Sequence, residues 1–129
     1  MRRMVLLAVA TGVMLLSVSG IALAAFRYGS NDGETIYGTL NTDAIYGYGG
    51  DDRILGFDGN DLIVGGAGDD AIDAGFGRDV VYGGYGNDLI RVGDDKAADT
   101  VECGPGFDRV YVGYTDKFGT DCEVRILVK

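Results

Sequence analysis

Large aliphatic residues recur at every ninth position through most of the chain, and each follows an acidic residue by two positions. Written in nines from Gly29, the chain gives seven unbroken rows over residues 29–91, an eleven-residue row over 92–102 and a last row over 103–111. Position eight of the rows holds Ile36, Ile45, Ile54, Ile63, Ile72, Val81, Ile90, Val101 and Val110. Position six holds Glu34, Asp43, Asp52, Asp61, Asp70, Asp79, Asp88, Asp99 and Asp108. A fixed period of this kind predicts a stack of repeated supersecondary units.

Each row predicts one turn followed by one short strand. Positions one to six are rich in glycine and end in an acid, a composition typical of turns. Positions seven to nine hold an aliphatic residue between two others, which predicts a short strand with a single inward side chain. Two rows then make one coil of eighteen residues, and coils stack about 4.8 Å apart. We therefore expect an all-β fold, a right-handed parallel β-roll with two parallel sheets.

The acids of position six are the candidate metal ligands. Residues eighteen apart fall on the same edge of the roll, so Asp43, Asp61 and Asp79 form one column and Glu34, Asp52, Asp70 and Asp88 form the other. The carboxylates within such a column repel one another unless a cation neutralises them. The alternative is that these acids are merely solvated. Ca²⁺ takes six to eight oxygen ligands from carboxylates and backbone carbonyls, whereas Mg²⁺ demands tighter octahedral geometry. We expect calcium between the pairs Asp43/Asp61, Asp61/Asp79, Asp52/Asp70 and Asp70/Asp88.

Two rows, GGAGDDAID (65–73) and GGYGNDLIR (83–91), match the pattern G-G-x-G-x-D-x-U-x at every defined position, where U is a large aliphatic residue. The chain thereby resembles the RTX, or hemolysin-type, calcium-binding repeat proteins. The resemblance implies several bound calcium ions, with Asp108 added to the aspartate ligands. It also implies that turn carbonyls complete each shell, for which the candidates are Gly50, Gly59, Gly66, Gly68, Gly77, Gly84 and Gly86. Tyr48 and Phe57 at position two and Ala74 at position one depart from the pattern.

The first 24 residues have the pattern of a secretory signal peptide. Arg2 and Arg3 precede an apolar run over residues 4–16, and Ala22-Leu23-Ala24 has the A-x-A form of a cleavage site. We expect cleavage after Ala24. Cleavage after Ala25, or retention of the segment as a membrane anchor, are the alternatives. In every case residues 25–28 form a lead-in to the roll, and the rest of the chain is placed outside the cytoplasm, secreted if the segment is cleaved.

Residues 112–129 are expected to form a C-terminal cap with a final strand, because residues 122–128 alternate apolar and polar side chains. Cys103 and Cys122 are the only cysteines. In an exported protein such a pair predicts one disulfide, which would tie the cap to the last row. Free thiols or a metal site are the alternatives.

One outer face of the roll is expected to be apolar. Positions seven and nine point outward, and alternate rows contribute to alternate sheets. Rows two, four and six carry Ala44, Tyr46, Leu62, Val64, Val80 and Tyr82, whereas the opposite face is mixed. A continuous apolar patch predicts a homodimer or an extracellular protein partner. The alternative is that the C-terminal tail or residues 26–28 cover it.

Composition narrows the function. The 129 residues include 23 Gly, 20 Asp and Glu, 11 Lys and Arg, and no His, for a net charge of −9. The charge disfavours nucleic acid as a partner. The absence of His excludes His-dependent catalysis and, with no reduced Cys expected, disfavours zinc and copper. We expect a non-catalytic, calcium-dependent module with an affinity of roughly 10⁻⁴–10⁻³ M. The alternatives are an adhesion or structural module acting through the apolar face, an ice-binding solenoid and a small hydrolase. An ice-binding solenoid needs a flat ladder of Thr, whereas Thr35 and Thr100 are isolated. The acids that a hydrolase could use are already explained by their fixed position in the repeat.

Overall fold

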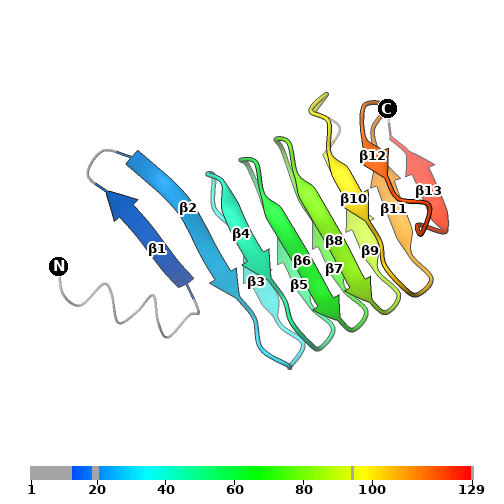
Figure 1. The fold of residues 1–129 in the computed structure, drawn as a ribbon, viewed down its shortest axis with the longest axis horizontal. Helices are drawn as coiled ribbons and strands as arrows, with labels where there is room; N and C mark the ends of the chain where they lie inside the picture. The colour runs from blue at the N-terminus through cyan, green and yellow to red at the C-terminus, as the bar shows by residue number, and fades with distance from the viewer. Residues whose placement is uncertain (1–12, 19–20, 94, 129) are drawn as a thin grey trace.

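The computed structural model describes residues 13–18, 21–93 and 95–128, with side chains from Ala25 onward, and shows a parallel β-solenoid (Figure 1). Its strands are β1 (Val13–Val18), β2 (Ile21–Tyr28), β3 (Thr35–Tyr37), β4 (Asp43–Tyr46), β5 (Arg53–Leu55), β6 (Leu62–Ala67), β7 (Ala71–Asp73), β8 (Val80–Tyr85), β9 (Leu89–Arg91), β10 (Thr100–Glu102), β11 (Arg109–Val112), β12 (Lys117–Phe118) and β13 (Val124–Leu127). Within the described residues, no helix is long and apolar enough to cross a membrane.

The strands alternate between two sheets, as the rows predict. One sheet has the order β1-β2-β4-β6-β8-β10-β12, and the other has the order β13-β11-β9-β7-β5-β3. Neighbouring strands of the roll pair in parallel with a register of eighteen residues, as in Ile45 with Ile63 and Ile54 with Ile72. The two residues added to the eighth row lengthen this spacing, so that Val101 pairs with Val81 at a separation of twenty. The β-roll with two parallel sheets is confirmed.

The core is a single file of aliphatic side chains between the two sheets. All nine residues of position eight are buried, from Ile36 to Val110. The residues on either side of each of them in the strands are half-buried or exposed, because side chains alternate across a strand. One aliphatic side chain per row leaves little apolar burial for each coil, so the turns must contribute to holding the stack together.

The turns depend on backbone with positive φ. Gly66 and Gly84 at position two have φ of 100° and 96°, a region that favours glycine. Tyr48 and Phe57 occupy the same position with φ of 72° and 74°. These two rows depart from the repeat in sequence but keep its turn, at a conformational cost of about 1 kcal/mol or more per residue.

The N-terminal lead-in is a strand of the roll. Residues 25–28 of β2 pair in parallel with β4, from Ala25 opposite Asp43 to Tyr28 opposite Tyr46. On its other edge β2 pairs with the antiparallel strand β1, from Ile21 opposite Val18 to Arg27 opposite Val13, so residues 25–27 pair with both neighbouring strands. The predicted signal peptide falls in large part on residues outside the described ranges, and its cleavage stays a prediction. Cleavage after Ala24 would leave the pairing of β2 with β4 intact.

The C-terminal segment caps the roll and places one strand on each sheet. β12 pairs with β10, and β13 pairs with β11. Phe118 packs against the core, and the Arg125 guanidinium lies 4.7 Å from the centre of the Phe118 ring. Cys103 and Cys122 form a disulfide with a Cα–Cα distance of 5.3 Å, which confirms the predicted pairing. The cap therefore closes both sheets, whereas the sequence predicted a single final strand.

The predicted apolar face is on the outside of the sheet that contains β4, β6 and β8. Ala44, Tyr46, Leu62, Val64 and Val80 are half-buried, and Tyr82 is exposed. Neither proposed cover lies over this face. Phe26 and Tyr28 extend it by one strand, and the rings of Tyr28 and Tyr46 stack at 5.7 Å. The C-terminal strands extend the ends of the two sheets instead of folding across the patch.

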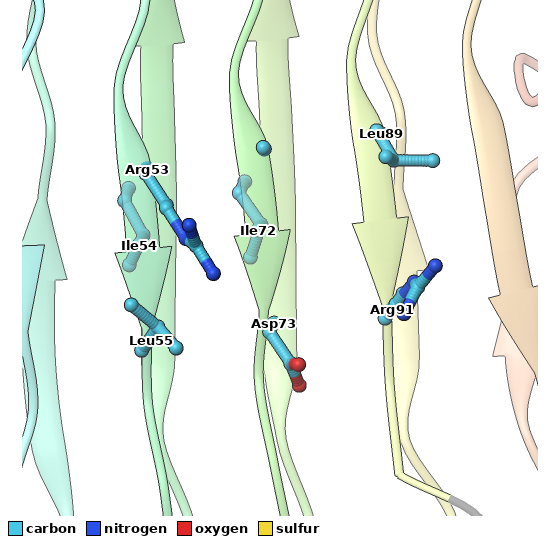
Figure 2. Close-up of a pocket in the computed structure, with 8 residues that line it drawn as sticks. Arg53, Ile54, Leu55, Ile72, Asp73, Leu89 and Arg91 are labelled. Carbon is cyan, nitrogen blue, oxygen red and sulfur yellow. The ribbon is translucent and has the colours of Figure 1, made fainter. Parts of the chain in front are cut away.

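The outer face of the other sheet is mixed in character, as expected. It carries a shallow hollow of about 310 Å³ lined by Arg53, Ile54, Leu55, Ala71, Ile72, Asp73, Leu89 and Arg91. Figure 2 shows Arg53 and Arg91 on either side of Asp73, on three successive strands of this sheet. The lining contains no side chain that commonly serves as a nucleophile beyond this single carboxylate.

Candidate calcium sites

The acids of position six lie inside the roll at its two edges. The eight aspartates of this position are at most 2% exposed: Asp43, Asp52, Asp61, Asp70, Asp79, Asp88, Asp99 and Asp108. Asp43 is the first residue of β4, and each of the other seven lies directly before a strand. Burial makes these carboxylates costly unless every oxygen has a partner.

One oxygen of each of these aspartates except Asp43 accepts a hydrogen bond from the preceding coil. The backbone N–H of Asp43 donates to Asp61 Oδ1 at 2.8 Å, and the N–H of Asp61 donates to Asp79 Oδ1 at 2.8 Å. On the other edge the N–H groups of Asp52 and Asp70 donate to Asp70 Oδ1 and Asp88 Oδ1 at 2.8 and 2.9 Å. The four pairs that the sequence predicted are therefore brought together, each by a direct hydrogen bond.

The second oxygen has no such partner. Among the described residues, Oδ2 of Asp52, Asp61, Asp70, Asp79, Asp88, Asp99 and Asp108 is buried without a hydrogen bond. Asp43 differs, because its Oδ2 accepts hydrogen bonds from Thr39 N and Oγ1. A buried carboxylate oxygen without a partner costs several kcal/mol if the group is charged. A proton or a cation is needed at these atoms.

Burial changes the acidity of these groups accordingly. It raises the pKa of Asp61, Asp79 and Asp88 to about 7 and that of Asp70 and Asp99 to about 6, and it also raises the pKa of Asp52 and Asp108. The N–H donated to each group lowers its pKa in part. Neighbouring carboxylates add to the rise. Without a cation, these side chains hold protons at a pH where exposed aspartate is ionised.

A glycine at position one lies directly against the unpartnered oxygen. A Cβ placed on Gly65 would lie 2.6 Å from Asp70 Oδ2 and 2.5 Å from the carbonyl oxygen of Gly83, one coil further on. A Cβ on Gly83 would lie 2.7 Å from Asp88 Oδ2 and 2.6 Å from the carbonyl oxygen of Cys103. These distances are too short for a carbon atom, so glycine is needed where a carboxylate oxygen and a backbone carbonyl lie this close to the Cα. The oxygen donors are of the kind that Ca²⁺ prefers.

The seven glycines proposed as backbone ligands all have positive φ, and two of them, Gly66 and Gly84, lie near the ends of β6 and β8. Their carbonyls run along the stack: those of Gly50, Gly66 and Gly68 lie close against Gly68, Gly84 and Gly86 one coil later. The backbone carbonyls beside Oδ2 belong to residues at position one instead. That the seven glycines act as calcium ligands therefore stays a prediction.

Two further acids, which the repeat pattern did not reveal, continue the columns into the cap. The N–H of Asp99 donates to Asp116 Oδ1 at 3.1 Å, and the N–H of Asp108 donates to Glu123 Oε2 at 2.7 Å. Their spacings of 17 and 15 residues break the repeat, so the pattern gave no signal for them.

A second ladder, also missed, follows position five. The N–H groups of Asp69, Arg78, Asn87 and Phe107 donate to Asp51, Asn60, Asp69 and Asn87. This ladder runs in the opposite direction to that of position six, and its Asp and Asn residues were visible in the rows. The turn edges are thus joined by two sets of side-chain hydrogen bonds per coil.

The cysteines hold no metal. Cys103, Asp121 and Cys122 lie close enough to suggest a site, but both sulfurs are in the disulfide and cannot act as thiolate ligands. The buried aspartate columns, with their unpartnered Oδ2 atoms, are therefore the sites whose chemistry fits a cation.

The fold and these sites define a class: a parallel β-solenoid of nonapeptide rows with buried acid columns. Residues 28–63 and 55–90 match the family model of the RTX calcium-binding nonapeptide repeat (4 copies). This match confirms the resemblance of these residues to the RTX repeat, and such repeats imply calcium binding in a β-roll. A comparison with curated proteins finds no match.

Among solved structures, the chain is similar to the AlgE6R3 subunit from the Azotobacter vinelandii mannuronan C5-epimerase, a solution structure. The identity is 26%, the match covers 79% of this chain and 53% of that one, and the TM-score is 0.27. This chain spans about half the length of that subunit. At that TM-score the comparison supports no statement about function.

Proposed function

We propose that the protein is a secreted, non-catalytic β-roll that folds when it binds several calcium ions outside the cell. The observation that carries this proposal is the set of buried Oδ2 atoms without a partner, one for nearly every row. Each such atom disfavours the folded chain at neutral pH unless a cation neutralises it. Metal binding is then coupled to folding, as in other modules whose site does not exist before the chain folds.

Charge and compartment support the same proposal. Removal of residues 1–24 would leave 20 acids against nine bases. Calcium is abundant outside the cell, and extracellular modules bind it at roughly 10⁻⁴–10⁻³ M. A roll with that affinity would stay unfolded during export and fold on release.

The test is far-UV circular dichroism of the chain from Ala25 during a calcium titration, with magnesium as the control. We expect a disordered spectrum that turns to β-sheet as calcium reaches about 0.1–3 mM, and no such change with magnesium. A β-rich spectrum that neither calcium nor chelator alters would contradict calcium-dependent folding. Elemental analysis of that sample would then distinguish a metal-free solenoid from one that retains its ions.

A second function, docking of a partner through the apolar face, has separate support. The face is uncharged from Phe26 to Tyr82, and no described segment covers it. In a chain this acidic, a second copy would be repelled elsewhere on the surface but not here. We expect Val64→Lys to leave calcium binding intact and to abolish any dimer observed by light scattering. An unchanged mass for the variant dimer would exclude this face as the interface.

A further inference from the structure

The aromatic residue at position two of the fourth row carries backbone strain that the following rows avoid. Phe57 has a φ of 74°, whereas Gly66, Gly75 and Gly84 hold position two of the next three rows, also with positive φ. This region is unfavourable for a bulky side chain and open to glycine. The Phe57 side chain is nevertheless 41% exposed, so the strain is not offset by full burial. Strained residues of this kind are frequent in ligand sites, and the surroundings of Phe57 contain one.

Phe57 lines a hollow that adjoins the mixed outer face. The hollow has a volume of about 230 Å³ and is lined by Leu55, Phe57, Asp58, Asp73, Gly75 and Phe76. The N–H of Phe76 donates to the Phe57 carbonyl at 2.7 Å, and Asp58 forms a parallel bridge with Phe76. The ring of Tyr37 stacks on that of Phe57, with the ring centres 6.3 Å apart and 10° between the planes. Backbone pairing and ring stacking thus place Phe57 and Phe76 on one hollow, although the Phe76 side chain is 61% exposed.

The lining has the chemistry of a site for an organic cation. Phe57, Phe76 and Leu55 supply apolar surface, and the face of an aromatic ring attracts a cation. Asp58 and Asp73 supply negative charge, and no residue of the lining is basic. Asp73 also lines the adjoining hollow, where it lies between two arginines (Figure 2), so Asp58 carries most of the attraction. The net charge of −9 favours a cation further and disfavours an anion.

We propose that this hollow, the aromatic hollow, binds the ammonium group of an organic amine. Its volume is below the roughly 300–1,000 Å³ of pockets that enclose drug-sized ligands, so it takes a head group and not a whole large molecule. A primary ammonium, as at the end of a lysine side chain, and a quaternary ammonium share this chemistry. The site is separate from the calcium columns, because none of its six lining residues belongs to position six of a row.

A titration of the purified protein with n-butylammonium chloride in saturating calcium tests the proposal, with backbone amides followed by NMR. We expect saturable shifts centred on Phe57, Asp58 and Phe76, with a Kd of about 1 mM or weaker. n-Butanol, which has the same chain and no charge, should shift these amides far less. Tetramethylammonium distinguishes the two sources, since tighter binding than n-butylammonium assigns a quaternary ligand and weaker binding a primary one. Equal shifts with n-butanol, or ammonium shifts spread evenly over the acidic surface, would overturn the proposal.

Two matched pairs of variants locate the site. Phe76→Ala and Tyr85→Ala each remove an exposed aromatic residue from position three, in successive rows and so at opposite edges. Phe57→Gly and Tyr48→Gly each place glycine at position two, where φ is positive. We expect Phe76→Ala and Phe57→Gly to weaken n-butylammonium binding about fivefold or more, and the two tyrosine variants to leave it unchanged.

Urea unfolding of the same variants guards against misfolding as the cause of any loss. Phe57→Gly should keep the stability of the wild type or exceed it, because glycine relieves the backbone strain. If Phe57→Gly is less stable, Phe76→Ala decides, since its ring is largely exposed. Binding that survives Phe76→Ala, or that Tyr85→Ala weakens equally, would exclude the aromatic hollow as the site.

Discussion

Acid should replace calcium as the stabilising agent of the roll. In chelator, protonation can neutralise the buried aspartates. The pKa of Asp61, Asp79 and Asp88 is raised from 3.8 to about 7 in the folded protein. The folded state therefore binds more protons than the unfolded state between about pH 4 and pH 7, and its stability falls as the pH rises through that window.

The size of the effect follows from the shifts. Between pH 7 and pH 5, a carboxyl group with a folded pKa of about 7 adds about 2 kcal/mol to the free energy of unfolding, and one with a pKa of about 6 adds about 1 kcal/mol. Independent titration of Asp61, Asp79, Asp88, Asp70 and Asp99 would give a total on the order of 10 kcal/mol. That is as large as the whole stability of many domains.

The assay is urea unfolding of the chain from Ala25 in chelator at pH 5, 6 and 7, followed by far-UV circular dichroism. We expect β-structure at pH 5 that is lost by pH 7, and recovery at pH 7 on adding calcium. Asp61→Asn should reduce the pH dependence by the share of one group. A calcium-free midpoint that is constant or rises from pH 5 to pH 7 would refute the reasoning.

Three further predictions concern the core, the cap and the turns, each measured by urea unfolding in saturating calcium. Ile63→Ala should cost about 2–5 kcal/mol because Ile63 is fully buried, whereas Val64→Ala on the outer face should cost less than about 1 kcal/mol. Replacing Cys103 and Cys122 together with Ser should cost about 3 kcal/mol, and hydrogen exchange should show β13 opening first; equal protection of β13 in both proteins would contradict a tethering role. Gly66→Ala should cost at least about 1 kcal/mol, because φ is 100° and the Tyr48 carbonyl lies where the methyl group would go.

The period of the sequence was sufficient to predict the architecture. One aliphatic residue in every nine identified most of the core, because the residue at position eight of each row faces inward between the two sheets. Ala74, Val92 and Val112 are buried in the same core but do not follow this pattern. The eighteen-residue coil brought Asp43 to Asp61 and Asp52 to Asp70 because residues two rows apart share an edge. The residues that broke the period, Asp116 and Glu123, could not be found this way, although they continue the same ladders.

What the sequence by itself determined was therefore the β-roll, its core, its disulfide and the two acid columns, all of which follow from periodicity or from a single pair of cysteines. Only the tertiary structure decided that the aspartates are buried, that Oδ1 of all but Asp43 accepts a hydrogen bond from the neighbouring coil, and that Oδ2 of the same seven is left without a partner. It also decided that Phe26 and Tyr28 extend the apolar face. The physical reason is that a repeat specifies which residues share a column, whereas the partner of each oxygen depends on backbone atoms eighteen residues away.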